Sequence, residues 1–503
     1  MEKNDSKQFS YISELIPEEN IDLWSPGDRI LITAQTGSGK SEFIKGRLYN
    51  YCLKNNKKIL LLSNRILLRE QIKEDLSEEN KHKIVKVINY QFFEKMVLGG
   101  NQVQELFSAY DYIVYDEVHY IFSDSQFNRN TDLLIDPIKN GFKNKIFIFL
   151  TATPQALLDY HSAYSHQYHL PFNYNYIKNI YTFTSEEIAE SILQNIPSDE
   201  KAIYFSSNAL TALDLSKKFS DAAFFCSDSN QLSDFSNSAV LSQISQNSKF
   251  NNRFLFTTKV LDNGVNIKDS KVKHILIDMP DVISFIQCLG RKRILDKEDY
   301  INLYIKDYHD GNLKYMLRGY LEKVRFVKEF KQISEDEFKE KYRKKDFDDV
   351  IDNDFRINLA KYQNYMTQSR LLRQMLWENK EKRGSYIHFI CKILKYDYKK
   401  IKNGNKVFEK ISIEDLLQKY VGIKMFKDEQ ERFKILFFDK IFSPKKTNYR
   451  HRGIRSINAI LQEDNLPYVL SSRKEKKRSS NRDKYYWLVS STENFPSSPN
   501  PTQ

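Results

Sequence analysis

The stretch Ala34-Gln35-Thr36-Gly37-Ser38-Gly39-Lys40-Ser41 decides the fold of this chain. It follows a short apolar run at 29–33 and opens a segment with helical spacing. Glycines let the backbone fold so that N–H groups point inward, and a helix start adds the positive end of its dipole. Lys40 is then placed to reach the outer phosphates of a nucleotide, and Ser41 to bind Mg²⁺. The stretch therefore predicts a phosphate-binding loop between a strand and a helix.

Short apolar runs rich in Ile, Leu, Val, Tyr and Phe alternate with helical segments in two successive sets. The first set is 29–33, 58–62, 84–88, 112–115 and 145–150. The second set is 202–205, 222–226, 254–257, 274–277 and 301–304, and we expect 173–185 to connect the sets. Buried parallel strands joined by helical crossovers have this pattern. The sequence therefore predicts an α/β fold with two parallel sheets in tandem.

A second motif, Ile113-Val114-Tyr115-Asp116-Glu117-Val118-His119, places two carboxylates at the end of an apolar run. Asp116 can hold Mg²⁺ through water, and Glu117 can orient or activate the water that attacks a phosphate. An Asp-Glu pair at a strand end is by itself usually a helix cap or a solvated turn. The phosphate loop upstream favours the catalytic interpretation.

With both motifs in place, residues 29–304 resemble superfamily 2 helicases of the DExH type. Residues 116–119 are similar to the DExH box of that family. Residues 151–154, Thr-Ala-Thr-Pro, are similar to the block that links its ATP site to its nucleic-acid site. The resemblance implies two RecA-like domains, with ATP and Mg²⁺ as cofactors. It implies His119, Thr151 and Thr153 for coupling, and Thr36, Gly37, Ser38, Gly39, Lys40, Ser41 and Asn266 for nucleotide binding.

Three further blocks, at 63–71, 89–91 and 257–267, resemble those that contact bound nucleic acid in this family. The contacts that they imply are Arg65, Gln91 and Thr258. In the third block, Asn266 stands where many family members carry Asp near the nucleotide ribose.

Residues 287–293, Gln-Cys-Leu-Gly-Arg-Lys-Arg, resemble the block that supplies arginine fingers across the domain cleft. Gln287 and Arg291 match it. In the usual spacing the second arginine falls at position 294, which is Ile294 here, and Arg293 precedes it. The main finger is therefore either Arg291 or Arg293. The resemblance implies a catalytic set of Lys40, Asp116, Glu117, Gln287, Arg291 and Arg293.

The character of the sequence changes past Tyr308, where Gly and Pro become scarce and helical spacing predicts helices at 313–330 and 359–377. A helix at 454–461 and strands at 468–471 and 485–489 follow, in the order that ends a winged-helix module. The predicted domains are 1–172 (RecA-like domain 1, which binds ATP), 173–308 (RecA-like domain 2), 309–442 (helical accessory region), 443–490 (candidate basic winged helix) and 491–503 (disordered tail).

Basic charge favours a polyanionic partner, because binding to phosphates releases counterions. The formal net charge of the chain is +12 and its pI is about 9.1. Residues 441–490 hold twelve Lys or Arg against four Asp or Glu. Within the basic turn 473–482 we expect phosphate contacts from Lys474, Lys476, Lys477 and Arg478. The alternative is a solvated basic loop.

Other features limit the class of protein. The four cysteines form no CxxC pair, which argues against zinc and iron–sulfur sites. No apolar stretch approaches the ~20 residues that span a bilayer, and the polar N-terminus lacks a signal core, so we expect a cytoplasmic protein without a membrane partner. The aspartates at 346–354 favour a charged loop over a nuclease site, and Trp377 is expected in a core.

The sequence thus predicts an ATP-dependent helicase or translocase that prefers DNA over RNA. The preference rests on the candidate winged helix and on the missing adenine signature of DEAD-box RNA helicases, whose spacing Trp24 and Gln35 do not match. Two alternatives stay open. One is an RNA helicase of the same superfamily. The other is an origin-binding or defence-complex subunit that uses its ATPase as a switch.

Overall fold

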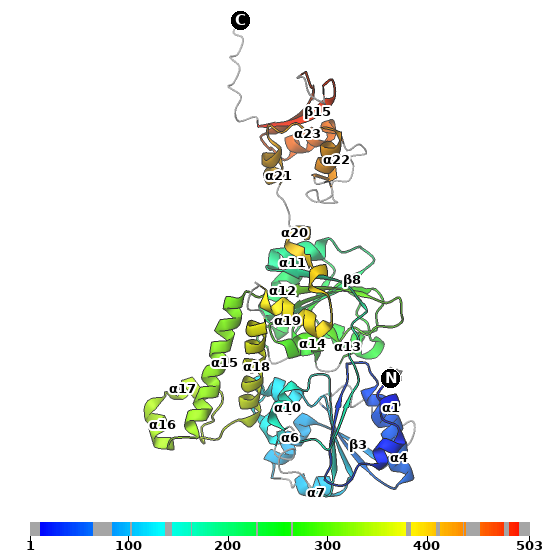
Figure 1. Cartoon of the computed structure of the whole chain (residues 1–503), viewed down its shortest axis with the longest axis vertical. Coiled ribbons are helices and arrows are strands. Elements are labelled where there is room, and N and C mark those ends of the chain that lie inside the picture. The colour runs from blue at the N-terminus through cyan, green and yellow to red at the C-terminus, as the bar shows by residue number, and fades with distance from the viewer. Residues whose placement is uncertain are drawn as a thin grey trace, which may run out of the picture. The chain divides into compact units, whose positions relative to one another are not determined.

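The phosphate loop leaves the fifth strand of a six-stranded parallel sheet in the computed structural model, in the order β3-β2-β4-β5-β1-β6 (Figure 1). The strands are β1 (Arg29–Thr33), β2 (Ile59–Ser63), β3 (Val85–Asn89), β4 (Tyr112–Asp116), β5 (Ile146–Thr151) and β6 (His166–His169). The structure describes residues 11–63, 83–100, 103–135, 143–161, 163–227, 230–262, 265–378, 384–408, 413–435, 437–438, 453–476 and 482–491.

Helices cover both faces of this sheet, which explains why its strands are nearly continuous apolar runs. One face buries Ile30 and Ile32 of β1 against the helices around the phosphate loop. These are α1 (Ile12–Leu15), α2 (Glu18–Asp22), α3 (Lys40–Glu42), the π-helical turn Phe43–Leu48 and α4 (Tyr49–Lys54). The other face buries Leu31 under α6 (Tyr90–Leu98), α7 (Val103–Ser108), α8 (Tyr120–Ser123) and α10 (Gln155–Tyr160).

The register of the strands brings the predicted motifs to one edge of the sheet. Thr33 pairs with Thr151, and Asp116 pairs with Leu150. Because all these strands are parallel, the phosphate loop, the carboxylate motif and the 151–154 block leave the sheet at the same end. The sheet therefore places three sequence blocks, separated by up to about 120 residues, around a common edge.

A second parallel sheet follows, with the strand order β13-β7-β12-β11-β8-β10-β9. Its strands are β7 (Ile177–Phe183), β8 (Lys201–Ser206), β9 (Ala222–Phe225), β10 (Phe254–Thr257), β11 (Val272–Asp278), β12 (Ile301–Lys306) and β13 (Lys402–Asn403). Its helices are α11 (Glu186–Gln194), α12 (Ala209–Ser216), α13 (Ser238–Asn247) and α14 (Val282–Leu289). Two parallel sheets in one α/β chain agree with the predicted fold class.

Besides the two-residue β13, which falls in the predicted helical region 309–442, two strands of the sheets were not expected from the sequence. The segment that we predicted as a connection, 173–185, contains β7, and β6 ends the first sheet. Neither strand is an apolar run: β6 reads His-Gln-Tyr-His and β7 reads Ile-Lys-Asn-Ile-Tyr-Thr-Phe. β6 lies at a sheet edge and β7 next to the two-residue strand β13, where polar residues are tolerated because one side is less covered.

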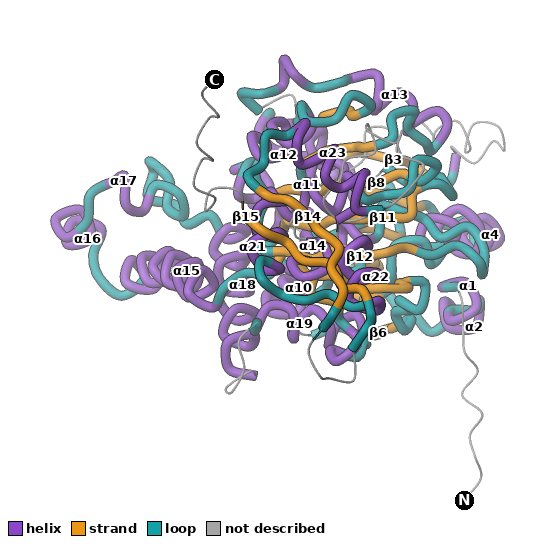
Figure 2. The backbone as a smooth tube through the Cα atoms, turned by 90° about the horizontal axis from the view of Figure 1, so that it is seen from above, coloured by secondary structure: helices purple, strands orange, loops and turns teal. Residues whose placement is uncertain are grey.

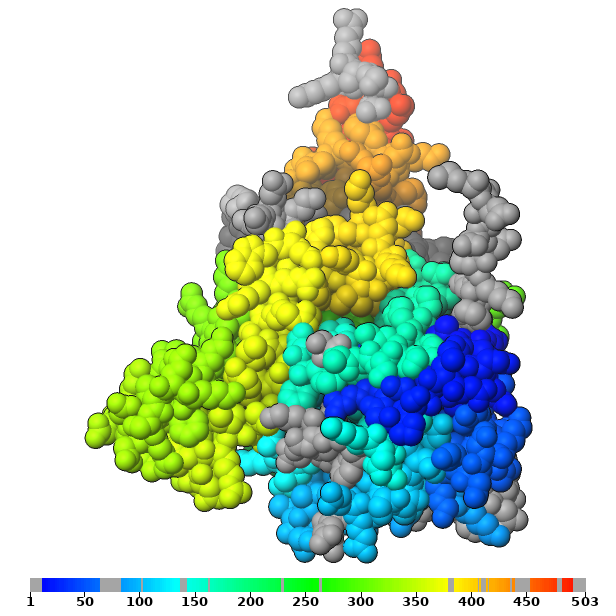
Figure 3. Space-filling view, turned by 60° about the horizontal axis from the view of Figure 1, so that its bottom comes forward, coloured from blue at the N-terminus to red at the C-terminus, as the bar shows by residue number. Residues whose placement is uncertain are grey.

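A helical arm follows β12. It consists of α15 (Asp310–Phe330), α16 (Glu335–Lys341), α17 (Lys344–Phe347) and α18 (Leu359–Glu378). The short helices α16 and α17 lie away from both sheets (Figures 1 and 2) and form a protrusion on the surface (Figure 3). This tip has its own small core, which includes Phe326, Phe338, Phe347 and Tyr365. Helices α19 (Ser385–Leu394) and α20 (Gly404–Phe408) complete this part of the chain.

The chain separates into two compact units, 1–407 and 408–503. The second unit holds α21 (Ile413–Tyr420), α22 (Lys427–Ile435), α23 (Ile454–Glu463) and an antiparallel hairpin of β14 (Tyr468–Lys474) and β15 (Tyr485–Ser491). Met425 and Trp487 exchange backbone hydrogen bonds of 2.9 Å, so the segment between α21 and α22 adds a short third strand to the hairpin. Three helices, this short strand and a hairpin follow each other in the order of a winged helix.

Three expectations need correction or lie outside the described residues. Trp377 is 63% exposed and is not a core residue, because helical spacing puts it opposite the buried Leu372 and Met375 of α18. The basic turn is shorter than predicted, since Arg473 and Lys474 belong to β14. Of the expected disordered tail, 491–503, Ser491 instead ends β15, and 492–503 lie outside the described part of the chain. No helix among the described residues is long and apolar enough to cross a bilayer.

Candidate active site

The phosphate loop has the backbone conformation that its glycines were expected to allow. Gly37 and Gly39 adopt φ values of +94° and +82°, which lie in the left-handed region that side chains disfavour. The loop is tied to the N-terminal helices because Ile12 N–H donates to the carbonyl of Ser38 (3.1 Å). Lys40 begins α3 and is only 7% exposed. Its Nζ donates to the carbonyl of Ala34 (3.1 Å), so the lysine folds back over its own loop.

Asp116 and Glu117 lie buried beside this lysine. Glu117 Oε1 is 3.5 Å from Lys40 Nζ, and both side chains are almost inaccessible to solvent. Glu117 has a φ of +49°, a conformation that non-glycine residues adopt at a cost of about 1–3 kcal/mol. Strain of this kind persists where the surrounding structure holds a side chain in a required place. Here it directs the Glu117 carboxylate toward the phosphate loop.

The backbone of Asp116 is held by a buried tyrosine. Tyr90 Oη donates to the carbonyl of Asp116 (2.8 Å). Burial raises the pKa of Tyr90 well above its usual value, and the nearby charge of Asp116 raises it further. The phenol therefore stays protonated and remains a donor at neutral pH. Asp116 itself is 2% exposed.

The described donors suit Mg²⁺. Ser41 lies at the start of α3, directly after Lys40, and Asp116 ends β4 at the same edge of the sheet. A hydroxyl and a carboxylate are the oxygen ligands that Mg²⁺ takes when it also binds nucleotide phosphates. The two residues thus provide a fitting donor set, and Glu117 is not needed as a ligand.

A chain of polar contacts leads from this site to the second domain. His119 Nδ1 lies 3.4 Å from Glu117 Oε2 and 3.3 Å from Thr151 Oγ1. Thr151 Oγ1 accepts a hydrogen bond from the backbone N–H of Thr153 (3.0 Å). Thr153 Oγ1 in turn accepts one from Nε2 of Gln287 (3.2 Å), which belongs to α14 of the second domain. The structure therefore brings the three predicted coupling residues into one continuous path.

The two candidate arginines differ in what they contact. Arg291 is fully buried, and its Nη2 donates to Oε1 of Gln287 (3.0 Å). Arg293 donates from Nε to Oδ1 of Asn266 (2.8 Å). A Cβ atom added to Gly37 would lie 2.7 Å from Nη1 of Arg293, so this guanidinium lies directly against the phosphate loop. Arg291 braces the helix end, whereas Arg293 faces the loop.

A comparison with protein families supports the assignment of 34–41 as a phosphate-binding loop. Residues 5–156 match the family model described as type III restriction enzyme, res subunit. Over these residues the chain is similar to the helicase-like subunit of that enzyme family. The match covers the phosphate loop, the DExH box and the 151–154 block. A comparison with curated proteins finds no match.

Solved helicase structures are similar to this chain at low identity. S. cerevisiae Dbp5 L327V, bound to RNA and ADP BeF3, is 15% identical over 58% of this chain and 82% of its own, with a TM-score of 0.40. The Hef helicase domain of Pyrococcus furiosus is 14% identical over 59% and 95%, with a TM-score of 0.33. Escherichia coli HrpB, a DEAH/RHA helicase, is 13% identical over 72% and 50%, with a TM-score of 0.39. At this level of similarity, the substrates of these proteins do not indicate the substrate of this chain.

One contact of the candidate site was not foreseen. Gln35, in the phosphate loop, accepts a hydrogen bond at Oε1 from the backbone N–H of Asn173 (3.0 Å) and donates from Nε2 to Oη of Tyr176 (3.4 Å). Asn173 and Tyr176 lie just before β7, between the two helicase domains. Burial raises the pKa of Tyr176 above its usual value. No sequence signal connects residues about 140 positions apart, so only the fold reveals this link.

The candidate nucleic-acid residues are dispersed. Gln91 donates from Nε2 to Oη of Tyr120 (2.8 Å), and Thr258 Oγ1 accepts from the backbone N–H of Val260 (3.4 Å). Next to Thr258, Lys259 Nζ donates to the carbonyl of Ser123 in the first domain (3.4 Å). Arg65, Lys477 and Arg478 lie outside the described residues.

The described residues of the basic turn belong to the second unit. Lys474 Nζ lies 3.1 Å from Oδ1 of Asp483, across the mouth of the hairpin. Lys476 is exposed. The one acid of this stretch, Glu475, is 6% exposed and forms an ion pair with Lys424 at the side of the hairpin. Glu475 is thus turned inward, whereas its described neighbours Lys474 and Lys476 are exposed.

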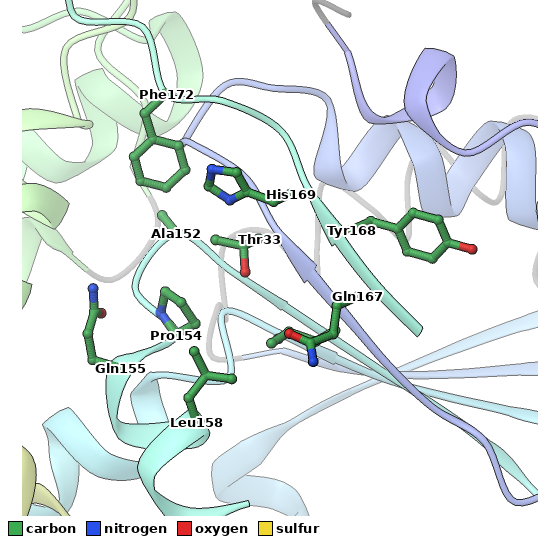
Figure 4. Close-up of a pocket in the computed structure, with 10 residues that line it drawn as sticks. Thr33, Ala152, Pro154, Gln155, Leu158, Gln167, Tyr168, His169 and Phe172 are labelled. Carbon is green, nitrogen blue, oxygen red and sulfur yellow. The ribbon is translucent and has the colours of Figure 1, made fainter. Parts of the chain in front are cut away.

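A cavity of about 340 Å³ lies behind the coupling block of the first domain (Figure 4). It is lined by Leu31, Thr33, Ala152, Pro154, Gln155, Leu158, Gln167, Tyr168, His169 and Phe172. Leu31 belongs to the face of the sheet that α10 covers, whereas the helices of the phosphate loop cover the opposite face. The lining includes Thr33, which directly precedes the phosphate loop, but no residue of the loop itself.

The aspartates of the arm do not form a metal site. Among the described residues no group of three or more His, Cys, Asp or Glu side chains could hold a metal ion. Asp349 instead accepts a hydrogen bond from Lys361 Nζ (2.7 Å) and another from Oη of Tyr365. These contacts fit the predicted charged loop between helices.

Proposed function

We propose that this chain is an ATP-driven motor that moves along or opens nucleic acid, with DNA as the preferred substrate. The observation that supports it best is the polar path from Lys40 and Glu117 through His119 to Thr153 and Gln287. This path joins the expected hydrolysis site to the other domain. A change at the nucleotide can then shift one domain against the other, and alternating grip between two domains moves a bound strand.

Each residue has a distinct role in the proposed hydrolysis. Lys40, now held by the carbonyl of Ala34 and by Glu117, would exchange these contacts for the β- and γ-phosphate oxygens of ATP. Glu117 would then orient the attacking water. Arg293 would place its charge at the γ-phosphate from across the cleft, and Ser41 and Asp116 would hold Mg²⁺. When bound, Mg²⁺ neutralises phosphate charge as the phosphoryl group is transferred.

Arg291 and Gln287 support this arrangement without facing the loop. Arg291 donates to Gln287, and Gln287 donates to Thr153, so the arginine fixes the orientation of the amide that links the domains. The neutral hydrogen bond between Gln287 and Thr153 contributes about 0.5–1.5 kcal/mol, and the one from the charged Arg291 about 1.5–3 kcal/mol. They are weak enough to break in each cycle and directional enough to define the closed state.

The second unit is the basis for the DNA preference. Helix α23 would serve as the recognition helix, because it precedes the hairpin and is fastened to it by Asn458. The amide of Asn458 donates to the carbonyl of Leu470 (2.9 Å) and accepts from its N–H (2.8 Å). A fixed helix beside a basic turn suits the groove and the phosphates of a duplex. We propose that this winged helix holds duplex DNA for the motor.

The deciding experiment is ATP hydrolysis by the purified chain alone, with single-stranded DNA, with duplex DNA and with RNA, using Lys40→Ala as the blank. We expect DNA to raise kcat well above the unstimulated value and RNA to raise it less. Stimulation by RNA alone would favour an RNA helicase. Equal activity with and without any nucleic acid would contradict the motor and favour an ATPase that serves as a switch.

A further inference from the structure

Helix α18 has its two ends embedded in different helicase domains. Near its start, Ala360 is fully buried in the core of the first domain. Near its end, Leu371, Leu372 and Met375 belong to the core of the second domain. A 20-residue helix rises about 30 Å, which is enough to span both domains. Any movement of one domain against the other therefore has to involve α18.

The middle of α18 is buried and polar. The buried polar residues between its ends are Gln363, Asn364, Thr367, Gln368 and Ser369, each at most 8% exposed. Burying polar side chains is unfavourable unless they find hydrogen-bond partners. Thr367 Oγ1 donates to Oδ2 of Asp159 (2.8 Å) in the first domain. Gln368 Nε2 donates to Oδ1 of Asp281 (2.8 Å) in the second domain. Two adjacent residues thus hold one carboxylate from each domain.

Both carboxylates belong to helices that carry catalytic blocks. Asp159 lies on α10, which begins directly after the 151–154 block, and Arg370 of α18 also donates to it (3.0 Å). Asp281 is the N-cap of α14, where it accepts from the backbone N–H of Ile283 (3.1 Å) and of Ser284 (3.2 Å). Helix α14 carries Gln287 and leads to Arg293. Helix α18 therefore connects α10, which follows Thr153, with α14, which carries the Gln287 that donates to Thr153.

We propose that Thr367 and Gln368 are positioning residues for ATP hydrolysis, which set the distance between α10 and α14 and so hold Arg293 against the phosphate loop. The inference rests on the proposed role of domain closure in hydrolysis. Adjacent residues on a helix are fixed relative to each other, so Asp159 and Asp281 can separate only if one of the two hydrogen bonds breaks. A hydrogen bond to a carboxylate is worth roughly tenfold in an equilibrium. The pair therefore favours the closed arrangement without locking it.

The contacts of Thr367 with Asp159 and of Gln368 with Asp281 form a polar seam between α18 and the two domains. Because these contacts are polar, the seam can open. When the seam opens, water can take the place of the Thr367 hydroxyl or the Gln368 amide at the carboxylate. No polar group is then left without a hydrogen bond. An apolar seam of the same area would resist opening, because separation would expose it to water. Helix α15 lies along α18 (Figure 1), where Tyr320 of α15 stacks on Tyr365 of α18, so the arm has to move with whichever domain α18 follows.

The test uses Gln368→Glu, which places a second carboxylate against Asp281, and the double variant Gln368→Glu with Asp281→Asn. Asn caps helices as well as Asp does, and its amide can donate to the introduced carboxylate, so the contact re-forms in the opposite direction. The control is Gln374→Glu, because Gln374 lies on the same helix and its side-chain amide donates to Glu378 (2.9 Å), away from both carboxylates of the seam. Three quantities are measured on the full chain: kcat for ATP, the Kd of a non-hydrolysable ATP analogue, and Tm.

We expect Gln368→Glu to lower kcat by about tenfold and to weaken binding of the analogue by about tenfold. Its Tm should equal that of Gln374→Glu. Adding Asp281→Asn should restore both kcat and the Kd of the analogue. Values of kcat and Kd equal to those of Gln374→Glu would overturn the inference. A loss that tracks a lower Tm and that Asp281→Asn does not restore would also overturn it, since α18 would then be structural only. Binding of the analogue needs no nucleic acid. A wild type that binds it but is not stimulated by DNA or RNA would therefore contradict the motor alone.

Discussion

Arg293 of the second domain lies so close to Gly37 of the phosphate loop that a single added carbon at Gly37 would come within 2.7 Å of its Nη1. Asn266 holds the same guanidinium through Nε and Nη2. This relationship distinguishes two arginines that the sequence left equivalent. Arg293 is displaced by one position from the usual spacing, yet it is the arginine that faces the loop.

We expect Arg293→Ala to lower kcat by at least about 10³, because an arginine finger contributes about 10³–10⁵ to phosphoryl transfer. Arg293→Lys should restore little, since lysine lacks the fork that grips phosphate oxygens and Asn266 together. Steady-state ATP hydrolysis measures this, with Tm as a check on folding. Arg291→Ala should instead lower Tm, because it leaves Gln287 without its buried donor. The opposite pattern would make Arg291 the finger.

Glu117→Gln should bind ATP and hydrolyse it at least about 10² more slowly, because the amide cannot activate water. Lys40→Ala should lose ATP binding itself. Equilibrium binding of a fluorescent ATP analogue, next to steady-state hydrolysis, separates the two effects. Wild-type hydrolysis by either variant would remove these residues from the proposed site.

Thr153→Val removes the hydroxyl that accepts from Gln287 while it keeps the volume of the side chain. A neutral hydrogen bond is worth about 1 kcal/mol, which is roughly fivefold. We expect the ratio of nucleic-acid-stimulated to unstimulated kcat to fall by about that factor. Thr153→Ser retains the hydroxyl and serves as the matched control. An unchanged ratio in the valine variant would show that the signal passes elsewhere.

Replacing Lys474 and Lys476 by alanine should weaken duplex binding and flatten its dependence on salt. Each phosphate contact adds about 0.9 to the slope of log K against log salt, so loss of two contacts lowers the slope by up to about 1.8. Titrations at several salt concentrations measure the slope. Lys392→Ala, which removes an exposed lysine paired with Glu378, is the control. Equal slopes in both variants would exclude the turn from DNA binding.

The arm should be sensitive to acid at Asp349. Burial alone raises the pKa of Asp349, but hydrogen bonds from Lys361 and Tyr365 outweigh it, so its pKa lies below the usual value. A carboxyl whose pKa is lowered in the folded state contributes stability above its unfolded pKa of about 3.9 and loses it as the pH falls through the folded value. Asp349→Asn should therefore increase hydrogen exchange of the arm tip at about pH 7, where that stability is fully present. A difference that persists undiminished below about pH 3.5 would contradict this origin.

Most strands were predictable because both faces of the two sheets are covered, and covered parallel strands must be apolar throughout. β6 and β7 were missed, since strands with polar residues lack that signal. The motifs at strand ends were also readable, because their chemistry requires particular residues at particular places. Gln368 and Asp281 could not be foreseen. Their importance comes from a meeting of helices about 90 residues apart, which no local pattern encodes.

All four cysteines are buried: Cys52 in the first domain, Cys226 and Cys288 in the second, and Cys391 on α19. Burial raises the pKa of Cys391 to about 12, and it raises the pKa of Cys52 as well. A thiol with a raised pKa is rarely ionised, and the thiolate is the form that reacts with maleimides. These cysteines therefore react slowly while the protein is folded. A cysteine introduced at the exposed Trp377, with a second at the exposed Leu98 of the first domain, would therefore accept dyes selectively in the natural background. Energy transfer between the two dyes could follow opening and closing one molecule at a time, without first removing any native thiol.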